Sequence, residues 1–163
     1  MKPEVTRFAM ERGLGLGVLF AANFIVSTMS SIAFISWGLE VLILWVTYKN
    51  GVRCRTEIME GEMSFGAGWW FTIQLFLYSA MVAGMCRFVY LQWLNPGALA
   101  AMGETMSQTF EQMRAAGVAM QETEALLKEL LQPINMALYS MMSDIIWGVV
   151  IGLVMGLVLR KKK

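Results

Sequence analysis

The sequence has 163 residues, of which 57% are hydrophobic, with a positive mean hydropathy and a formal net charge of +1. A chain of this length and hydrophobicity is not an ordinary soluble domain. Histidine is absent, and Cys54 and Cys86 show no metal or disulfide spacing. We therefore expect no metal, no cofactor and no nucleic-acid partner.

Long apolar runs predict an all-α integral membrane protein. The run from Phe8 to Tyr48 is about twice the ~20 residues that one helix needs to cross the hydrocarbon core. We interpret it as two helices joined by the small polar residues around Ser30. Two further runs follow. The four predicted transmembrane helices lie at about 8–28, 32–48, 68–91 and 134–159, in one membrane domain over residues 1–163.

Lysine and arginine are distributed unevenly between the two sides of the membrane. With four spans, one side of the membrane holds ten of these residues, and the other side holds only Arg114 and Lys128. Because positively charged loops stay in the cytoplasm, both termini and the loop 49–67 are predicted to be cytoplasmic. The segment 95–133 between spans three and four is then predicted to be extracytoplasmic.

The segment 95–133 predicts an amphipathic helical arm that starts at Asn95-Pro96, since proline is tolerated in a first helical turn. Its apolar residues recur at helical spacing on one face, as Met102, Met106, Phe110, Met113 and Met120. Gly117 is expected to separate this helix from a second one that ends near Pro133. Such an arm either lies on the outer leaflet or docks on a partner. Methionine sulfurs also suit Cu(I), but methionine at this spacing usually fills an apolar face.

Small residues recur at every fourth position in two of the predicted spans. Span one carries Gly13, Gly17 and Ala21, and span four carries Gly148, Gly152 and Gly156. Ridges of this kind let two helix backbones approach closely. They predict tight packing, either within the bundle or against another chain.

Three ionisable residues fall well inside the predicted spans: Glu40, Arg87 and Asp144. Glu11 and Arg12 lie in the first turns of span one, at its cytoplasmic end. The three deeper residues are expected ~12, ~6 and ~14 Å below the outer membrane boundary, and each would cost about 2.5–3.5 kcal/mol at the centre of an isolated helix. Arg87 is expected either to pair with one of the two acids or to extend outward to the headgroups. Polar side chains expected at similar depth are Asn23, Ser36, Ser140 and Ser143. The cluster is either an interhelical ionic clamp or a ligand or proton site.

Short motifs are spread along the chain. They are the turn Tyr48–Gly51, the start of span three at Ser64–Gly66, the Asn95-Pro96 pair and the lysine-rich tail. In this order they resemble an uncharacterised bacterial family, domain of unknown function 4199. The resemblance covers nearly the whole chain, carries no catalytic signature and implies a multi-pass protein of the bacterial inner membrane. Because such proteins are associated with membrane-bound family 2 glycosyltransferases, it also implies a helper for an enzyme that uses a polyprenyl-phosphate carrier.

Two functional hypotheses follow. The first is a non-catalytic accessory or scaffold protein that anchors or positions a partner in the lipid bilayer, such as a polyprenyl-phosphate glycosyltransferase. The glycine ridges, the arm and the lack of catalytic groups favour it. The second is a small transporter or proton-coupled carrier that uses Glu40 and Asp144. Because four spans without an internal repeat are few for a carrier, this protein would be a homo-oligomer. An enzyme built on these carboxylates ranks third.

Overall fold

The computed structural model describes residues 3–28, 33–115 and 129–161. Its elements in chain order are α1 (Pro3–Thr28), α2 (Ala33–Arg53), the π-helical turn η2 (Cys54–Ile58), α3 (Phe65–Val89), the π-helical turn η3 (Tyr90–Leu94), α4 (Pro96–Ala115) and α6 (Pro133–Leu159). The all-helical fold class is confirmed for these residues. The predicted turn near Ser30, the predicted break at Gly117 and most of the second predicted arm helix lie outside the described residues.

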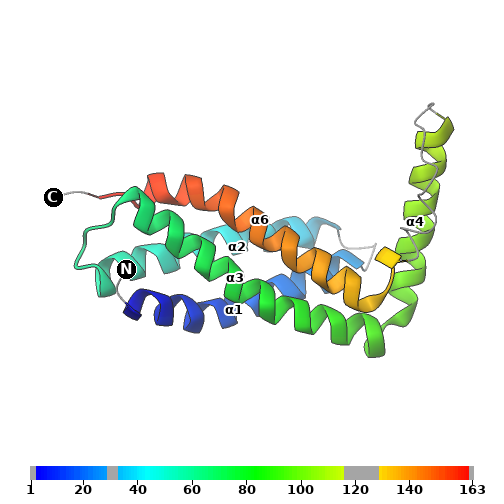
Figure 1. Cartoon of the computed structure of the whole chain (residues 1–163), viewed down its shortest axis with the longest axis horizontal. Coiled ribbons are helices and arrows are strands. Elements are labelled where there is room, and N and C mark those ends of the chain that lie inside the picture. Colours follow the sequence, from blue (N-terminus) through cyan, green and yellow to red (C-terminus); the bar gives the residue numbers. More distant parts are fainter. Residues whose placement is uncertain (1–2, 29–32, 116–128, 162–163) are drawn as a thin grey trace.

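Four helices, α1, α2, α3 and α6, lie side by side along the long axis of the molecule (Figure 1). The two termini lie at one end of this bundle, and α4 projects from the other end. α1 and α3 run in the same direction, because successive residues of α1 contact successive residues of α3: Phe8 with Phe71, Gly13 with Tyr78, and Gly17 with Val82. α6 runs the opposite way, since Gly156 faces Gly68 while Met141 faces Gly84.

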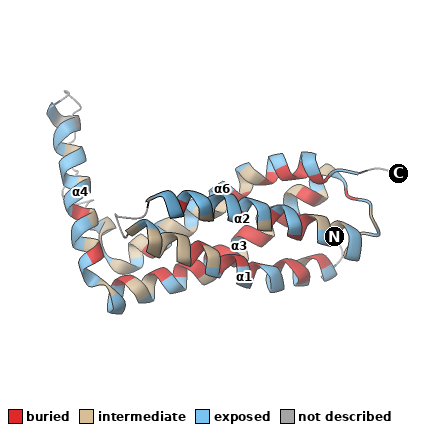
Figure 2. Cartoon of the chain, turned by 180° about the vertical axis from the view of Figure 1, so that it is seen from behind, coloured by how far each residue is buried: buried red, intermediate tan, exposed pale blue. Residues whose placement is uncertain are grey.

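α3 is the central helix of the bundle. It packs most extensively on α6 and on α1, and its fully buried apolar residues are Phe71, Leu75, Phe76, Ala80 and Ala83. α2 contacts chiefly α1, and most of its residues are exposed (Figure 2). α2 is therefore the peripheral helix of the four.

Both glycine ridges lie against α3, so both are used inside the bundle. A methyl group added to Gly13 would lie 2.7 Å from Tyr78 Cβ, and one added to Gly17 would lie 2.7 Å from Ser79 O. On α6, added methyl groups would meet Phe76 at Gly148, Trp69 at Gly152 and Phe65 at Gly156. The absence of side chains at these positions lets α1 and α6 approach α3 closely from two sides.

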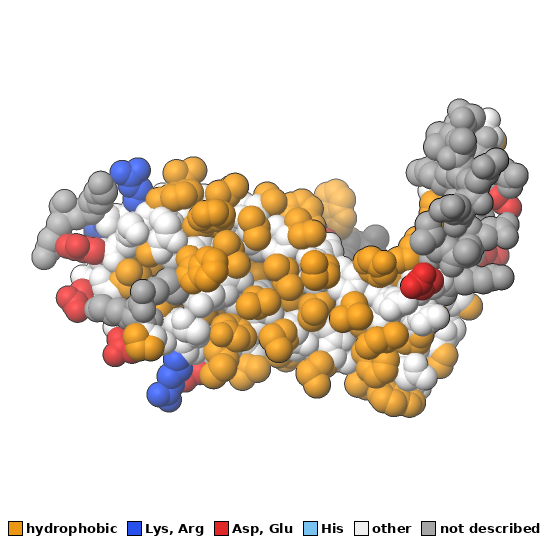
Figure 3. Space-filling model, in the orientation of Figure 1, with side chains coloured by type: hydrophobic (Ala, Val, Ile, Leu, Met, Phe, Trp, Pro, Cys, Tyr) orange, Lys and Arg blue, Asp and Glu red, His pale blue; other side chains and the backbone are white. Residues whose placement is uncertain are grey.

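Three of the described helical segments are long and apolar enough to cross a membrane: Pro3–Thr28, Phe65–Leu94 and Pro133–Leu159. The described part of α2, which begins at Ala33 and includes Glu40, Lys49 and Asn50, is not among them. On the face seen in Figure 3, hydrophobic side chains cover the middle of the bundle, and lysine and arginine gather at the end that holds the termini.

At the end of the bundle that holds the termini, the connection between α2 and α3 is largely helical and is hydrogen-bonded to the C-terminal segment. α2 continues past Tyr48 to Arg53 and is followed by η2, so much of the predicted loop 49–67 is helical. The backbones of Met63 and Lys161 pair with each other, and Arg55 Nη1 donates to Leu159 O at 3.2 Å. These bonds tie the C-terminal segment to the connection between α2 and α3.

A polar cleft as the candidate functional site

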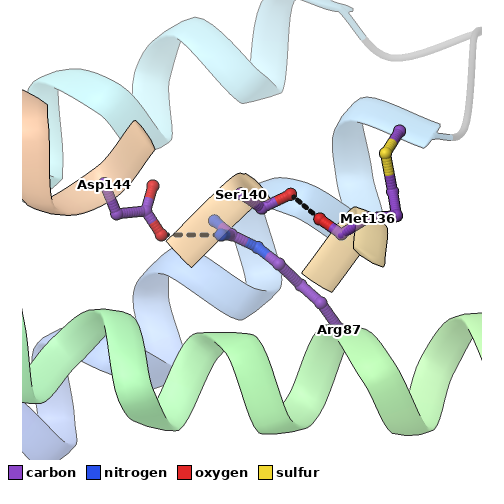
Figure 4. A network of polar contacts seen from close by, with 4 residues as sticks. All are labelled: Arg87, Met136, Ser140 and Asp144. Carbon is purple, nitrogen blue, oxygen red and sulfur yellow. Dashed lines mark hydrogen bonds and ion pairs between the residues drawn. The ribbon is translucent and has the colours of Figure 1, made fainter. Parts of the chain in front are cut away.

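Arg87 lies on α3 two residues before the helix ends, and only 6% of it is exposed. Its Nη1 donates to Asp144 Oδ2 on α6 at 2.6 Å, and the Asp144 side chain is 14% exposed (Figure 4). A guanidinium among apolar helices is costly unless a carboxylate compensates it. The sequence left three arrangements open for Arg87: a pair with Asp144, a pair with Glu40, or extension to the headgroups. The structure shows the pair with Asp144.

The remaining surroundings of Arg87 are partly aromatic. Its Cζ lies 5.2 Å from the ring centre of Phe24 on α1, a cation–π geometry that also stabilises a buried cation. Its Nε is buried, and within the described residues it has no hydrogen-bond partner. The guanidinium is thus neutralised, but its hydrogen-bonding capacity is not filled.

The other polar residues predicted at this depth are placed differently from one another. Ser36 Oγ donates to Asn23 Oδ1 at 2.7 Å and so links α2 to α1. Ser140 Oγ donates to Met136 O of its own helix at 2.8 Å (Figure 4). Ser143 and Glu40 are exposed, and within the described residues Glu40 forms no ion pair.

Two adjoining cavities meet at the ion pair and form one cleft, which we call the polar cleft. The cavity nearer the α4 end of the bundle, which we call the outer cavity, has a volume of about 370 Å³. It is lined by Phe24, Tyr139 and Ser140 in addition to the pair. The inner cavity, of about 400 Å³, has Arg87, Ser143 and Asp144 in common with it and extends to further residues of α1, α2, α3 and α6: Phe20, Asn23, Glu40, Phe76, Trp147 and Ile151. Every helix of the bundle therefore contributes to the cleft.

The charges of the polar cleft do not cancel. With all three groups ionised, Arg87 supplies one positive charge and Asp144 and Glu40 supply two negative ones. Among the described residues, no three His, Cys, Asp or Glu side chains are arranged to hold a metal ion. The arrangement can pair charges, hold a hydrogen-bonding group at Arg87, or accept a positive charge beside Glu40.

Sequence reasoning named the polar members of the cleft and missed its aromatic walls. Phe20, Asn23 and Phe24 share one face of α1 by their spacing of three and four residues, and Asp144 and Trp147 share one face of α6. Reading each polar residue together with its neighbours at i±3 and i±4 would have identified Phe20 and Trp147, and Phe24 follows Phe20 by one further turn. The residue that faces Arg87 could not be identified in this way, because it lies on a different helix.

A second polar contact that the sequence did not indicate lies towards the end of the bundle that holds the termini. Gln74 Nε2 on α3 donates to Thr6 Oγ1 on α1 at 3.1 Å. The Gln74 Oε1 atom is buried and has no partner among the described residues. This contact lies outside the polar cleft.

Comparison with known proteins gives a family and no activity. The sequence model of a family described as "protein of unknown function (DUF4199)" matches residues 11–161. The chain belongs to the DUF4199 family. Neither the curated proteins nor the solved structures that were searched contain a match. The DUF4199 match includes every residue of the polar cleft, so the function has to be argued from the geometry of that cleft and of the bundle.

Proposed function

We propose that this DUF4199 protein is a non-catalytic accessory protein of the bacterial inner membrane, in which α1, α2, α3 and α6 all cross the bilayer. The shared direction of α1 and α3 supports the fourth crossing. If both of these helices cross the membrane, the chain between them has to return, and α2, with 21 residues or ~31 Å, is long enough to do so.

The accessory role rests on one observation: the most peripheral of the four helices exposes large aromatic side chains on its outer side. α2 faces the rest of the bundle with a narrow stripe, whose buried members are Ser36, Ile43, Thr47, Asn50 and Gly51. Its outer side exposes large aromatic residues, with Phe34 91% and Trp37 74% exposed. Aromatic residues are enriched in the cores of protein interfaces, so this outer side is where we place the partner.

The position of α4 supports a surface role for the arm. α4 begins at Asn95-Pro96, where Asn95 Oδ1 accepts a hydrogen bond from the Ala98 N–H at 3.2 Å, and it projects away from the bundle axis (Figure 1). With the bundle upright in the membrane, α4 would lie along the outer surface. There its half-buried residues Met102, Met106 and Phe110 can rest on the leaflet or on the partner.

The partner that the family resemblance favours is a membrane-bound glycosyltransferase that uses a polyprenyl-phosphate carrier. We would purify the tagged full-length chain from native membranes and identify what stays bound in a stoichiometric ratio. Trp37→Ala, on the outer side of α2, should reduce the amount of bound partner several-fold. Trp70→Ala is the matched control, because it removes an exposed tryptophan from α3.

Loss of the partner with Trp37→Ala and its retention with Trp70→Ala would support the accessory role. A chain that purifies alone or only with copies of itself, in the wild type as in both variants, would contradict it.

The polar cleft favours a second candidate, a small proton-coupled carrier. Glu40 and Asp144 line the same inner cavity, and carboxylates within the membrane commonly serve as ion or proton sites. Stable Glu40→Gln and Asp144→Asn proteins that keep their partner but lose biological activity would favour the carrier over the accessory role.

A further inference from the structure

The polar cleft has more room and one more hydrogen-bond donor than an ionic clamp uses. Buried donors are nearly always satisfied. Here the inner cavity, of about 400 Å³ and open between α2 and α6, adjoins a guanidinium that is 6% exposed and whose Nε is buried without a partner among the described residues. Arg87 lines both cavities. A volume of this size, an unmet donor and apolar walls with a few polar groups are the features of a small-molecule site.

The charge of the cleft selects the kind of ligand. Asp144 already neutralises Arg87, so the carboxylate of Glu40 is the charge in the inner cavity without a counter-ion among the described residues. An anion would face two carboxylates, whereas a cation would pair with the ionised form of Glu40. A ligand with a single positive charge removes this imbalance.

The walls of the inner cavity suit an organic cation rather than a metal ion. Phe20, Phe76 and Trp147 supply aromatic rings, and the faces of such rings attract cations, while Ile43 and Ile151 extend an apolar surface. We propose that the polar cleft binds a hydrophobic monovalent organic cation, with its charge beside Glu40 and its apolar groups against these rings. A hydrogen-bond acceptor in the same ligand would satisfy Arg87 Nε.

The ligand can reach the cleft from the bilayer. α2 and α6 both line the inner cavity but contact each other far less than α3 contacts α6. Leu44 on α2 and Trp147 on α6 line this cavity and are 41% and 58% exposed, so the cleft opens sideways between these two helices. Hydrophobic cations dissolve in membranes and are well placed to enter by this route.

This inference rests on the membrane placement proposed above, and it gives the carrier candidate a substrate class. It is tested by binding alone, without transport. The accessory role is tested by co-purification, so its failure would not affect the ligand proposal. A failure of cation binding would likewise not affect the accessory role.

The test uses two probes of nearly the same shape and opposite charge, tetraphenylphosphonium and tetraphenylborate. Each is titrated into the full-length protein in nanodiscs, with binding to empty nanodiscs subtracted. Tetraphenylphosphonium should saturate at one per chain, and tetraphenylborate should not saturate. Glu40→Gln should weaken tetraphenylphosphonium binding by about tenfold or more, because it removes the charge that pairs with the ligand.

Two further variants separate loss of charge from loss of fold. Glu40→Asp keeps the charge and should retain most of the binding, and Glu104→Gln removes an exposed carboxylate of α4 and should leave binding unchanged. Equal saturable binding of both probes, or undiminished tetraphenylphosphonium binding by a folded Glu40→Gln protein, would overturn the proposal. Weak binding by Glu40→Gln with full binding by Glu40→Asp would support it.

Discussion

Arg87 illustrates at the scale of one residue what a buried charge requires. Its predicted depth made a partner necessary, and Glu40 and Asp144 were both within the reach of its side chain. The sequence could not choose between them, because depth along a helix does not say which way a side chain points around it. In the structure the partner is Asp144, at 2.6 Å, while Glu40 faces the inner cavity.

The Arg87–Asp144 pair predicts strong coupling between two substitutions. Breaking a buried pair from one side costs about 3–5 kcal/mol, so Arg87→Met and Asp144→Asn should each destabilise the protein by that order. The double variant should lose less than the sum, because neither group is left without its partner. We would measure unfolding free energies in mixed micelles. Additive losses in this double variant, or stronger coupling between Arg87→Met and Glu40→Gln, would show that the pair is not the main contact of Arg87.

Cys54 gives a prediction about pH. Its side chain is fully buried in η2, and burial together with the nearby Glu57 carboxylate raises the pKa of the thiol to about 11. Because the thiolate is the reactive form, iodoacetamide should label Cys54 very slowly at pH 8 and faster as the pH approaches 11. The experiment uses a Cys86→Ala protein, so that Cys54 is the single thiol. Labelling at pH 8 as fast as in denaturing detergent would mean that η2 does not protect it.

At the scale of the elements, two glycine ridges make α3 the centre of the bundle. The four-residue repeat in the sequence identified both ridges. A repeat of small residues does not show, however, which helix the ridge packs against. The structure shows that α1 and α6 both use their ridges on α3. The peripheral position of α2 was not predictable either, because an apolar run gives no information about which helices become neighbours.

The α6 ridge predicts a position-specific effect of a large side chain. Gly152→Leu should push α6 away from Trp69 and lower stability by about 1–3 kcal/mol or more, since overpacking forces the helices apart. Gly15→Leu is the matched control, because no atom lies within 4 Å of the space that its side chain enters. Thermal stability in detergent would be compared for both variants. Equal effects of the two substitutions would contradict the close contact between α6 and α3.

At the scale of the whole molecule, the apolar runs and the distribution of lysine and arginine predicted most of the architecture. They predicted an all-helical chain, and the described part of the chain is all-helical. They could not predict the open cleft, because its volume depends on how far α2 and α6 stand apart. The shared direction of α1 and α3, which only the structure shows, is what favours a crossing by α2.

The central claim is that α2 crosses the bilayer, because the depth of Glu40 and the position of the arm depend on it. The most direct measurement fuses a pair of reporters, one active outside the cytoplasm and one active inside, before Met1, after Gly61, at Gly103 in α4, and after Lys163. Four crossings with a cytoplasmic N-terminus predict inside, inside, outside and inside for these four sites. If the N-terminus and Gly61 lie on opposite sides of the membrane, only one of α1 and α2 crosses, and the predicted crossing of α2 is contradicted.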